Sequence, residues 1–289
     1  MLISTFGGDK IRKDKILTNA IYSLDKLILE FEMSGENAQR LMDVYSFNSK
    51  PYTHVESWFS NKLSVCRYNY RFLLKDGNSF YIGFCPNWRK SNRYTTYGRI
   101  EFNPSKVCLD SEFMFLYGQL LSFIPRFRLR PVRFDLAIDL PVARDKVYLL
   151  KDRRLYEEYS YSAINKTQYL GVRNNHGRVK VYNKALEQKL DIDLTRIEVT
   201  IDWEKSTYGE VEKILPNLYI LDNFQFSMGL SGTDKVILVA VMSDMTLLSE
   251  LGRTKKEKIK SYLREIEYNL TLDYDKYNNV LQQIKKIIE

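Results

Sequence analysis

The chain has 289 residues, of which 44% are apolar, which suffices for a core in one large domain or two modest ones. No apolar run approaches the roughly 20 residues that a membrane-spanning helix needs, and the N-terminus lacks the apolar segment of a secretory signal. Three cysteines without paired spacing indicate a reducing, cytoplasmic location. With no long apolar run, no membrane partner is expected. The net charge of +8 favours a polyanionic partner such as nucleic acid.

Local patterns predict alternating strands and helices in the first half of the chain. In chain order they predict a strand at 24–34, a helix after the N-cap Ser34, a hairpin at 65–85, a polar loop at 86–96, a strand at 97–106 and a helix at 111–124. The hairpin turns at Asp76-Gly77, and the second helix ends before Pro125.

The second half begins with strands and becomes helical. Strands are predicted at 130–139, 167–172, 178–184 and 194–203, with a short helix at 185–190, a buried strand or helix at 235–242 and charged helices from 243 onward. A boundary is expected between 205 and 235. The fold class is α+β, with a largely antiparallel sheet, helices on one face and a helical C-terminal segment.

Three of these strands separate apolar from polar residues, because side chains alternate along a strand. The apolar side carries Phe134, Leu136, Ile138, Val179, Val181, Ile197, Val199 and Ile201. The polar side carries Asp135, Asp139, Arg178, Lys180, Tyr182, Lys184, Arg196, Glu198 and Asp202. If the strands are neighbours, the polar residues form one surface. The plain alternative is a half-solvated sheet whose charges pair with each other.

Such a surface has the groups that phosphodiester transesterification needs. Carboxylate oxygens suit Mg²⁺ or Mn²⁺, which would polarise a scissile phosphate. A tyrosine oxygen could then attack the phosphorus and hold the strand end covalently. A free phenol has a pKa of about 10, so a metal or a cation such as Lys180, Lys184 or Arg178 is expected to favour its ionised form.

The ordered set VRFDLAID (132–139), YLGVRNNHGRVKVYNKALEQ (169–188) and TRIEVTID (195–202) resembles the replication initiation factor family, also called Rep-trans. That family includes rolling-circle plasmid and phage initiators and related relaxases. The resemblance implies an HUH-endonuclease-like fold without the paired-histidine motif. This sequence agrees, since its two histidines, His54 and His176, are far apart.

The resemblance also implies roles for individual residues. Tyr182 falls on the nucleophile position, with Tyr169 as a rival. Asp135, Asp139 and Glu198 fall on metal-ligand positions, and Lys184 on a phosphate-contacting position. Arg173 and Arg178 match basic positions around the turn. In the turn itself, VRNNHGR departs from the commoner serine-containing form.

Further DNA contacts are expected from Lys180 and from the basic segment 86–93. This segment carries Trp88, Arg89, Lys90 and Arg93, and a loop with this composition can stack on a single strand or clasp it.

The sequence thus predicts a rolling-circle initiator that nicks one strand through a 5′-phosphotyrosine intermediate and later rejoins it. Residues 1–205 would bind and nick DNA, while 206–289 would complete the fold or aid binding. The implied partners are double-stranded origin DNA, the nicked single strand and a host helicase, with a homodimer left open. The alternatives are a conjugative relaxase, a DNA-binding protein that does not cut, and a metal-dependent nuclease that uses water.

Overall fold

The computed structural model describes residues 19–47, 54–60, 66–90, 93–124, 128–221 and 230–289. Within these ranges, no helix has the length and apolar character to cross a membrane. The chain packs into two compact units. Unit 1 comprises residues up to Tyr22 with Ala137–Val199 and Thr207–Tyr274, and unit 2 comprises Ser23–Leu136, Thr200–Ser206 and Asp275–Glu289.

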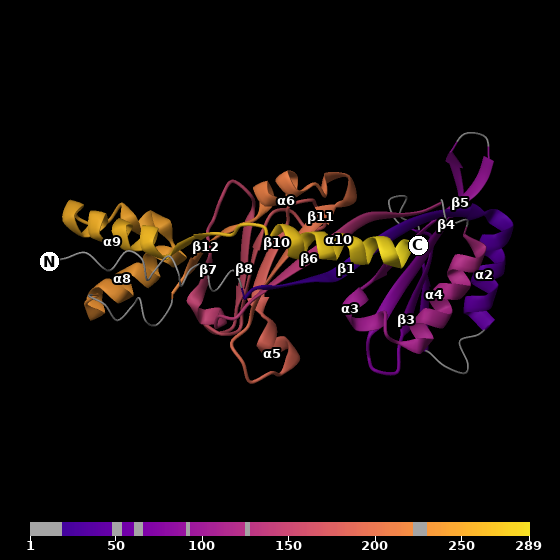
Figure 1. Cartoon of the computed structure of the whole chain (residues 1–289), viewed down its shortest axis with the longest axis horizontal. Helices are drawn as coiled ribbons and strands as arrows, with labels where there is room; N and C mark the ends of the chain where they lie inside the picture. Colours follow the sequence, from indigo (N-terminus) through magenta and orange to yellow (C-terminus); the bar gives the residue numbers. More distant parts are fainter. Residues whose placement is uncertain (1–18, 48–53, 61–65, 91–92, 125–127, 222–229) are drawn as a thin grey trace. The chain divides into compact units, whose positions relative to one another are not determined.

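Most of the strands belong to one sheet with antiparallel pairing (Figure 1). Their order is β2 (His54–Phe59), β3 (Tyr68–Leu73), β4 (Ser79–Lys90), β5 (Arg93–Phe102), β1 (Ile21–Ser34), β6 (Leu129–Leu140), β11 (Thr195–Asp202), β10 (Val179–Asn183), β9 (Lys166–Leu170) and β8 (Tyr156–Ser160). A second sheet contains β13 (Glu267–Asn269), β12 (Asn217–Ile220) and β7 (Val147–Leu149). The predicted α+β class with a large antiparallel sheet is confirmed.

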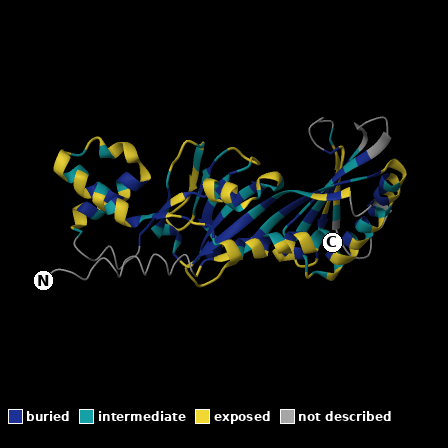
Figure 2. Ribbon diagram, turned by 45° about the horizontal axis from the view of Figure 1, so that its top comes forward, coloured by how far each residue is buried: buried dark blue, intermediate teal, exposed yellow. Residues whose placement is uncertain are grey.

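The longer helices carry both buried and exposed residues (Figure 2). The α-helices are α2 (Gly35–Phe47), α3 (Pro104–Val107), α4 (Ser111–Phe123), α5 (Lys184–Gln188), α6 (Tyr208–Ile214), α8 (Gly232–Ser243), α9 (Arg253–Ile266) and α10 (Tyr274–Ile288). Short 3₁₀ turns are η2 (Arg144–Lys146), η3 (Trp203–Lys205) and η4 (Met245–Leu248).

In unit 2, two helices cover the same face of the sheet. Tyr45 of α2 packs edge-on against Phe72 of β3, with ring centroids 4.9 Å apart. Phe113 of α4 packs edge-on against Phe80 of β4, at 5.0 Å. Phe72 and Phe80 lie opposite each other across the strands, so both helices bury the same apolar surface. In this unit the predicted placement of helices on one face is confirmed.

The local signals for the predicted caps and turns are confirmed. The Ser34 hydroxyl accepts a hydrogen bond from the Asn37 amide at 3.2 Å at the start of α2. Gly77 has a φ of 85°, the left-handed conformation that a glycine adopts without a steric penalty, and it turns β3 into β4. The segment 235–242, predicted as either a strand or a helix, is a helix.

The predicted loop at 86–96 is wrong. Its backbone extends β4 to Lys90 and begins β5 at Arg93, with Lys90 opposite Arg93 and a register shift between Cys85 and Trp88. Polar composition suggested a loop, but pairing between the two strands satisfies the backbone hydrogen bonds without any apolar requirement. The side chains of Trp88, Arg89, Lys90 and Arg93 lie outside the described part, so their predicted DNA contacts stay predictions.

The chain beyond residue 206 contributes to both units. In unit 1, β12 pairs with β7, and Leu238 of α8 and Ile259 of α9 share a buried cluster with Tyr219 of β12. In unit 2, α10 is anchored by the Tyr117 hydroxyl, which donates to the Ile287 carbonyl at 3.0 Å. One break between the compact units falls at Ser206/Thr207, inside the expected 205–235 interval, and others fall after Tyr22, Leu136, Val199 and Tyr274. The division of DNA-binding and nicking roles between 1–205 and 206–289 stays a prediction.

Asp234 joins α8 to α9 through an ion pair that should make this part of unit 1 acid-sensitive. Its buried carboxylate accepts hydrogen bonds from Lys255 at 2.6 Å and Lys258 at 3.0 Å, and these contacts hold its pKa well below the ordinary value of 3.8. A folded-state pKa below the unfolded one gives stabilisation that is present above about pH 4 and is lost as the pH falls further.

We expect Asp234→Asn to lower the thermal unfolding midpoint by a few degrees at pH 7, and by progressively less below pH 4. The measurement is thermal unfolding followed by circular dichroism across this pH range. Glu257→Gln is the matched control, because Glu257 pairs only with Lys260 on the exposed side of α9 and should change the midpoint little. If Asp234→Asn lowers the unfolding midpoint as much at pH 2.5 as at pH 7, the stabilisation does not come from the ion pair.

Candidate active site

The polar faces of β10 and β11 meet in unit 1, as the strand pattern predicts. Lys180 lies opposite Glu198, and Tyr182 lies opposite Arg196. Val181 of β10 is fully buried on the other face. Because directly opposed residues in an antiparallel pair project to the same side, this register gathers the tyrosine, the glutamate and two cations on one surface.

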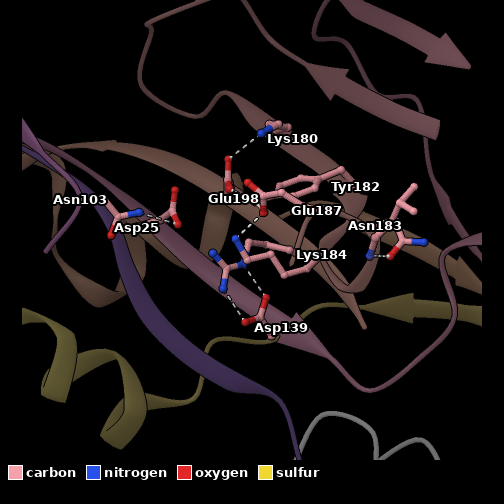
Figure 3. Close-up of polar contacts among 11 residues, drawn as sticks. Asp25, Asn103, Asp139, Lys180, Tyr182, Asn183, Lys184, Glu187 and Glu198 are labelled. Atoms are coloured by element: carbon pink, nitrogen blue, oxygen red, sulfur yellow. Dashed lines mark hydrogen bonds and ion pairs between the residues drawn. The ribbon is translucent and has the colours of Figure 1, made fainter. Parts of the chain in front are cut away.

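Tyr182 is hydrogen-bonded to two carboxylates (Figure 3). Its hydroxyl donates to Glu198 Oε1 at 2.6 Å, and Glu187 Oε2 lies 3.3 Å away. The tyrosine is 7% exposed. Burial raises the pKa of Tyr182 far above its usual range, and the negative charge of Glu198 raises it further. The Arg196 charge lowers this pKa, as expected of a nearby cation, but burial and the carboxylates outweigh it in this arrangement.

The two lysines around Tyr182 neutralise the carboxylates. Lys180 Nζ lies 3.4 Å from Glu198 Oε2 and 3.9 Å from the centre of the Tyr182 ring. Lys184 Nζ pairs with Glu187 and lies 5.8 Å from the same ring centre. The Lys184 side chain is only 2% exposed, so the sequence-predicted phosphate contact is not open to it in this arrangement. Lys180, at 35% exposure, is the accessible cation.

The short helix α5 brings Glu187 to the site. Asn183, directly after Tyr182, caps the helix by accepting a hydrogen bond from the Leu186 amide at 2.9 Å. The helix turn then places Glu187 three residues beyond Lys184, where the two side chains pair. Sequence reasoning did not select Glu187, although its spacing from Lys184 after a capping asparagine was a usable signal.

Asp139 is held by Arg196 in a bidentate ion pair. Arg196 Nε lies 2.6 Å from Asp139 Oδ1, and a terminal guanidinium nitrogen lies 2.7 Å from Oδ2. Both residues are buried, so the carboxylate and the guanidinium compensate each other's lost hydration. Arg196 was assigned only to the polar face by the sequence, and its partner could not be deduced because the two residues are 57 positions apart.

The predicted metal ligands fall in both compact units. Asp135 belongs to unit 2, where burial raises the pKa of its carboxyl and a hydrogen bond with Thr200 opposes that rise. The Asp139 carboxylate forms an ion pair with Arg196. The Glu198 carboxylate accepts a hydrogen bond from Tyr182 and pairs with Lys180. Across the described ranges, no three His, Cys, Asp or Glu side chains lie close enough to hold a metal ion together. Because Asp135 belongs to a different unit from Asp139 and Glu198, their shared metal site stays a prediction.

The conformation of the turn between β9 and β10 requires a glycine at position 171, within the sequence Tyr169-Leu170-Gly171-Val172-Arg173. Gly171 has a φ of 88°, and a side chain there would also approach the Arg178 backbone at 3.3 Å. Arg173 is exposed in this turn. The Arg178 guanidinium lies 4.7 Å from the centre of the Tyr169 ring, a cation–π contact on the surface that carries Lys180.

No protein-family model matches the chain. Relatives are found among the replication initiation proteins of Staphylococcus aureus. One is 25% identical over 182 residues, which cover 58% of this chain and 54% of that protein. Another is 23% identical over 188 residues, covering 60% of this chain and 56% of that protein. The chain spans about half the length of these curated relatives.

Among solved structures, the rolling circle replication initiator protein from Geobacillus stearothermophilus matches 93% of this chain and 97% of its own, at 14% identity and a TM-score of 0.36. The likeness to initiators therefore rests on the sequence relatives. Those relatives confirm the resemblance to replication initiators that the ordered motifs predict.

Proposed function

We propose that this chain is a rolling-circle replication initiator that binds origin DNA and nicks one strand with Tyr182 as the nucleophile. The observation that carries the proposal is the 2.6 Å hydrogen bond from the Tyr182 hydroxyl to Glu198. A nucleophile within hydrogen-bond reach of a carboxylate that can take its proton is the basic arrangement of nucleophilic catalysis. The sequence relatives, all named replication initiation proteins, support the same function.

In the proposed step, the Tyr182 oxygen attacks the scissile phosphorus while its proton passes to Glu198. A new bond forms between the tyrosine oxygen and phosphorus, and the bond between phosphorus and the 3′-oxygen breaks. The 3′-oxygen leaves with the electron pair and takes a proton from water. The product is a 5′-phosphotyrosine and a free 3′-hydroxyl, and the reverse reaction rejoins the strand.

Lys180 is the residue that should meet the phosphate first. It covers the Tyr182 ring, it is the more exposed of the two lysines, and its contact with Glu198 is 3.4 Å long. Movement of this side chain toward a phosphate would uncover Tyr182 and place a positive charge beside the anion. Buried Lys184 instead fixes Glu187.

The dependence on Mg²⁺ or Mn²⁺ stays part of the proposal without a defined site. Asp139 is paired with Arg196, and the described ranges contain no cluster of three His, Cys, Asp or Glu side chains able to hold a metal ion, so no chemical step is assigned to a metal here. The proposed partners are the origin duplex, the nicked single strand and a host helicase that would unwind the duplex. A relaxase with the same chemistry would differ only in the DNA sequence that it cuts.

Tyr182→Phe should abolish the covalent adduct while preserving the fold, because only the hydroxyl is removed. The test incubates the protein with end-labelled supercoiled DNA carrying its own origin, with and without Mn²⁺, and analyses the products on a denaturing gel. Tyr169→Phe is the matched control and should still form the adduct. An adduct that persists in Tyr182→Phe and disappears in Tyr169→Phe would transfer the role to Tyr169. Tight binding by the wild type without any adduct would indicate a protein that binds without cutting.

Glu198→Gln should slow nicking by roughly 10²- to 10⁴-fold, the usual contribution of a general base, with little effect on DNA affinity. The amide keeps the shape of the side chain but cannot accept the tyrosine proton. Glu187→Gln is the control and should have a smaller effect, since Glu187 lies farther from the hydroxyl and is more exposed.

Metal titration separates two roles for Glu198. If the residue accepts the proton, saturating Mn²⁺ leaves the defect of Glu198→Gln unchanged. Recovery of the wild-type nicking rate at high Mn²⁺ would instead identify Glu198 as a metal ligand and refute the general-base role.

Asp139→Asn should destabilise the protein by about 3 kcal/mol, because it leaves the Arg196 charge buried without its partner. The measurement is urea unfolding in EDTA and again in Mn²⁺, with equal losses expected. Asp202→Asn is the control, since its pair with Arg133 is more exposed and should be worth under about 1 kcal/mol. A wild-type stabilisation by Mn²⁺ that Asp139→Asn removes, with no loss in EDTA, would make Asp139 a metal ligand.

A further inference from the structure

The face that carries Tyr182 continues across two further strands of unit 1. Lys180 of β10 lies opposite Tyr169 of β9, and Tyr169 lies opposite Glu157 of β8. On its other side Lys180 lies opposite Glu198. Because opposed residues share a face, Tyr169 projects to the same side as the proposed nucleophile and its proton acceptor.

Two aromatic rings and a guanidinium group gather on this extension of the face. The Tyr159 ring packs edge-on against the Tyr169 ring, with centroids 5.9 Å apart and planes at 83°. The Arg178 guanidinium lies 4.7 Å from the centre of the Tyr169 ring. Tyr159 is 58% exposed, so a large part of this aromatic side chain faces solvent beside a cation.

We propose that Tyr159, Tyr169 and Arg178 form a stacking platform that holds single-stranded DNA next to Tyr182. This inference rests on the proposed nicking function and adds the path of the strand to it. Exposed bases stack on aromatic rings and on guanidinium planes with little regard to sequence, while a paired duplex does not offer its base faces. The platform therefore fits the single strand.

The charges on this face orient the strand. Lys180 belongs to β10 and Arg178 directly precedes that strand, whereas Glu157 belongs to β8 at the edge of the sheet. Phosphates should follow the two cations toward Tyr182, and bases should extend over the tyrosines of β8 and β9. On this assignment Tyr169 is a stacking residue that positions the strand, and Tyr182 is the nucleophile.

The test measures binding of fluorescein-labelled oligothymidylate by anisotropy in the Tyr182→Phe background, where no covalent step can contribute. Tyr159→Ala should weaken binding roughly 5- to 100-fold, the usual loss for one stacked base, and Tyr159→Phe should restore it. Tyr161→Ala is the matched control. Tyr161 is 88% exposed in the turn that follows β8, so its loss should leave the affinity unchanged.

A second probe separates stacking from charge. An oligomer of abasic deoxyribose phosphate keeps the phosphates but has no bases, so Tyr159→Ala should not weaken its binding. Arg178→Gln should weaken binding of both oligomers and reduce the salt dependence, because a phosphate contact is lost.

The platform is refuted if Tyr159→Ala binds oligothymidylate as tightly as the Tyr182→Phe parent. It is equally refuted if Tyr161→Ala weakens oligothymidylate binding as much as Tyr159→Ala does. It is also refuted if Tyr159→Ala weakens the abasic oligomer equally. These outcomes are independent of nicking. A wild-type protein that forms no adduct but shows the Tyr159 effect would retain the platform and lose the proposed function.

Discussion

The antiparallel register of β10 and β11 is the constraint on which the site depends. It sets Lys180 opposite Glu198 and Tyr182 opposite Arg196. A slip by one residue would turn Tyr182 toward the apolar interior and bring Val181 to the surface, because the side-chain period of a strand is two. Burial of Val181 and Ile197 on the opposite face thus fixes the register and holds the tyrosine against its carboxylate.

Charge compensation accompanies that register. Every carboxylate near Tyr182 has a cationic partner: Glu198 has Lys180, Glu187 has Lys184, and Asp139 has Arg196. A buried carboxylate with such a partner costs less to keep ionised than an isolated one.

The proposed platform also depends on strand register, here of β10, β9 and β8. Strand pairing carries the polar face from β11 through β10 and β9 to β8, and so links Tyr182, the proposed nucleophile, to the tyrosine rings of β9 and β8. A rigid sheet places these groups more accurately than a loop would, because its backbone positions are held by hydrogen bonds on both sides.

The sequence by itself determined the strands that carry the site, because alternation of apolar and polar residues reflects local geometry. It separated Val179 and Val181 from Lys180 and Tyr182 correctly. Tertiary structure alone decided the partners. Arg196 reaches Asp139, Lys184 is buried against Glu187, and the backbones of 86–90 and 93–96 belong to strands β4 and β5. Pairing and burial depend on neighbours distant in the chain, and local periodicity contains no information about them.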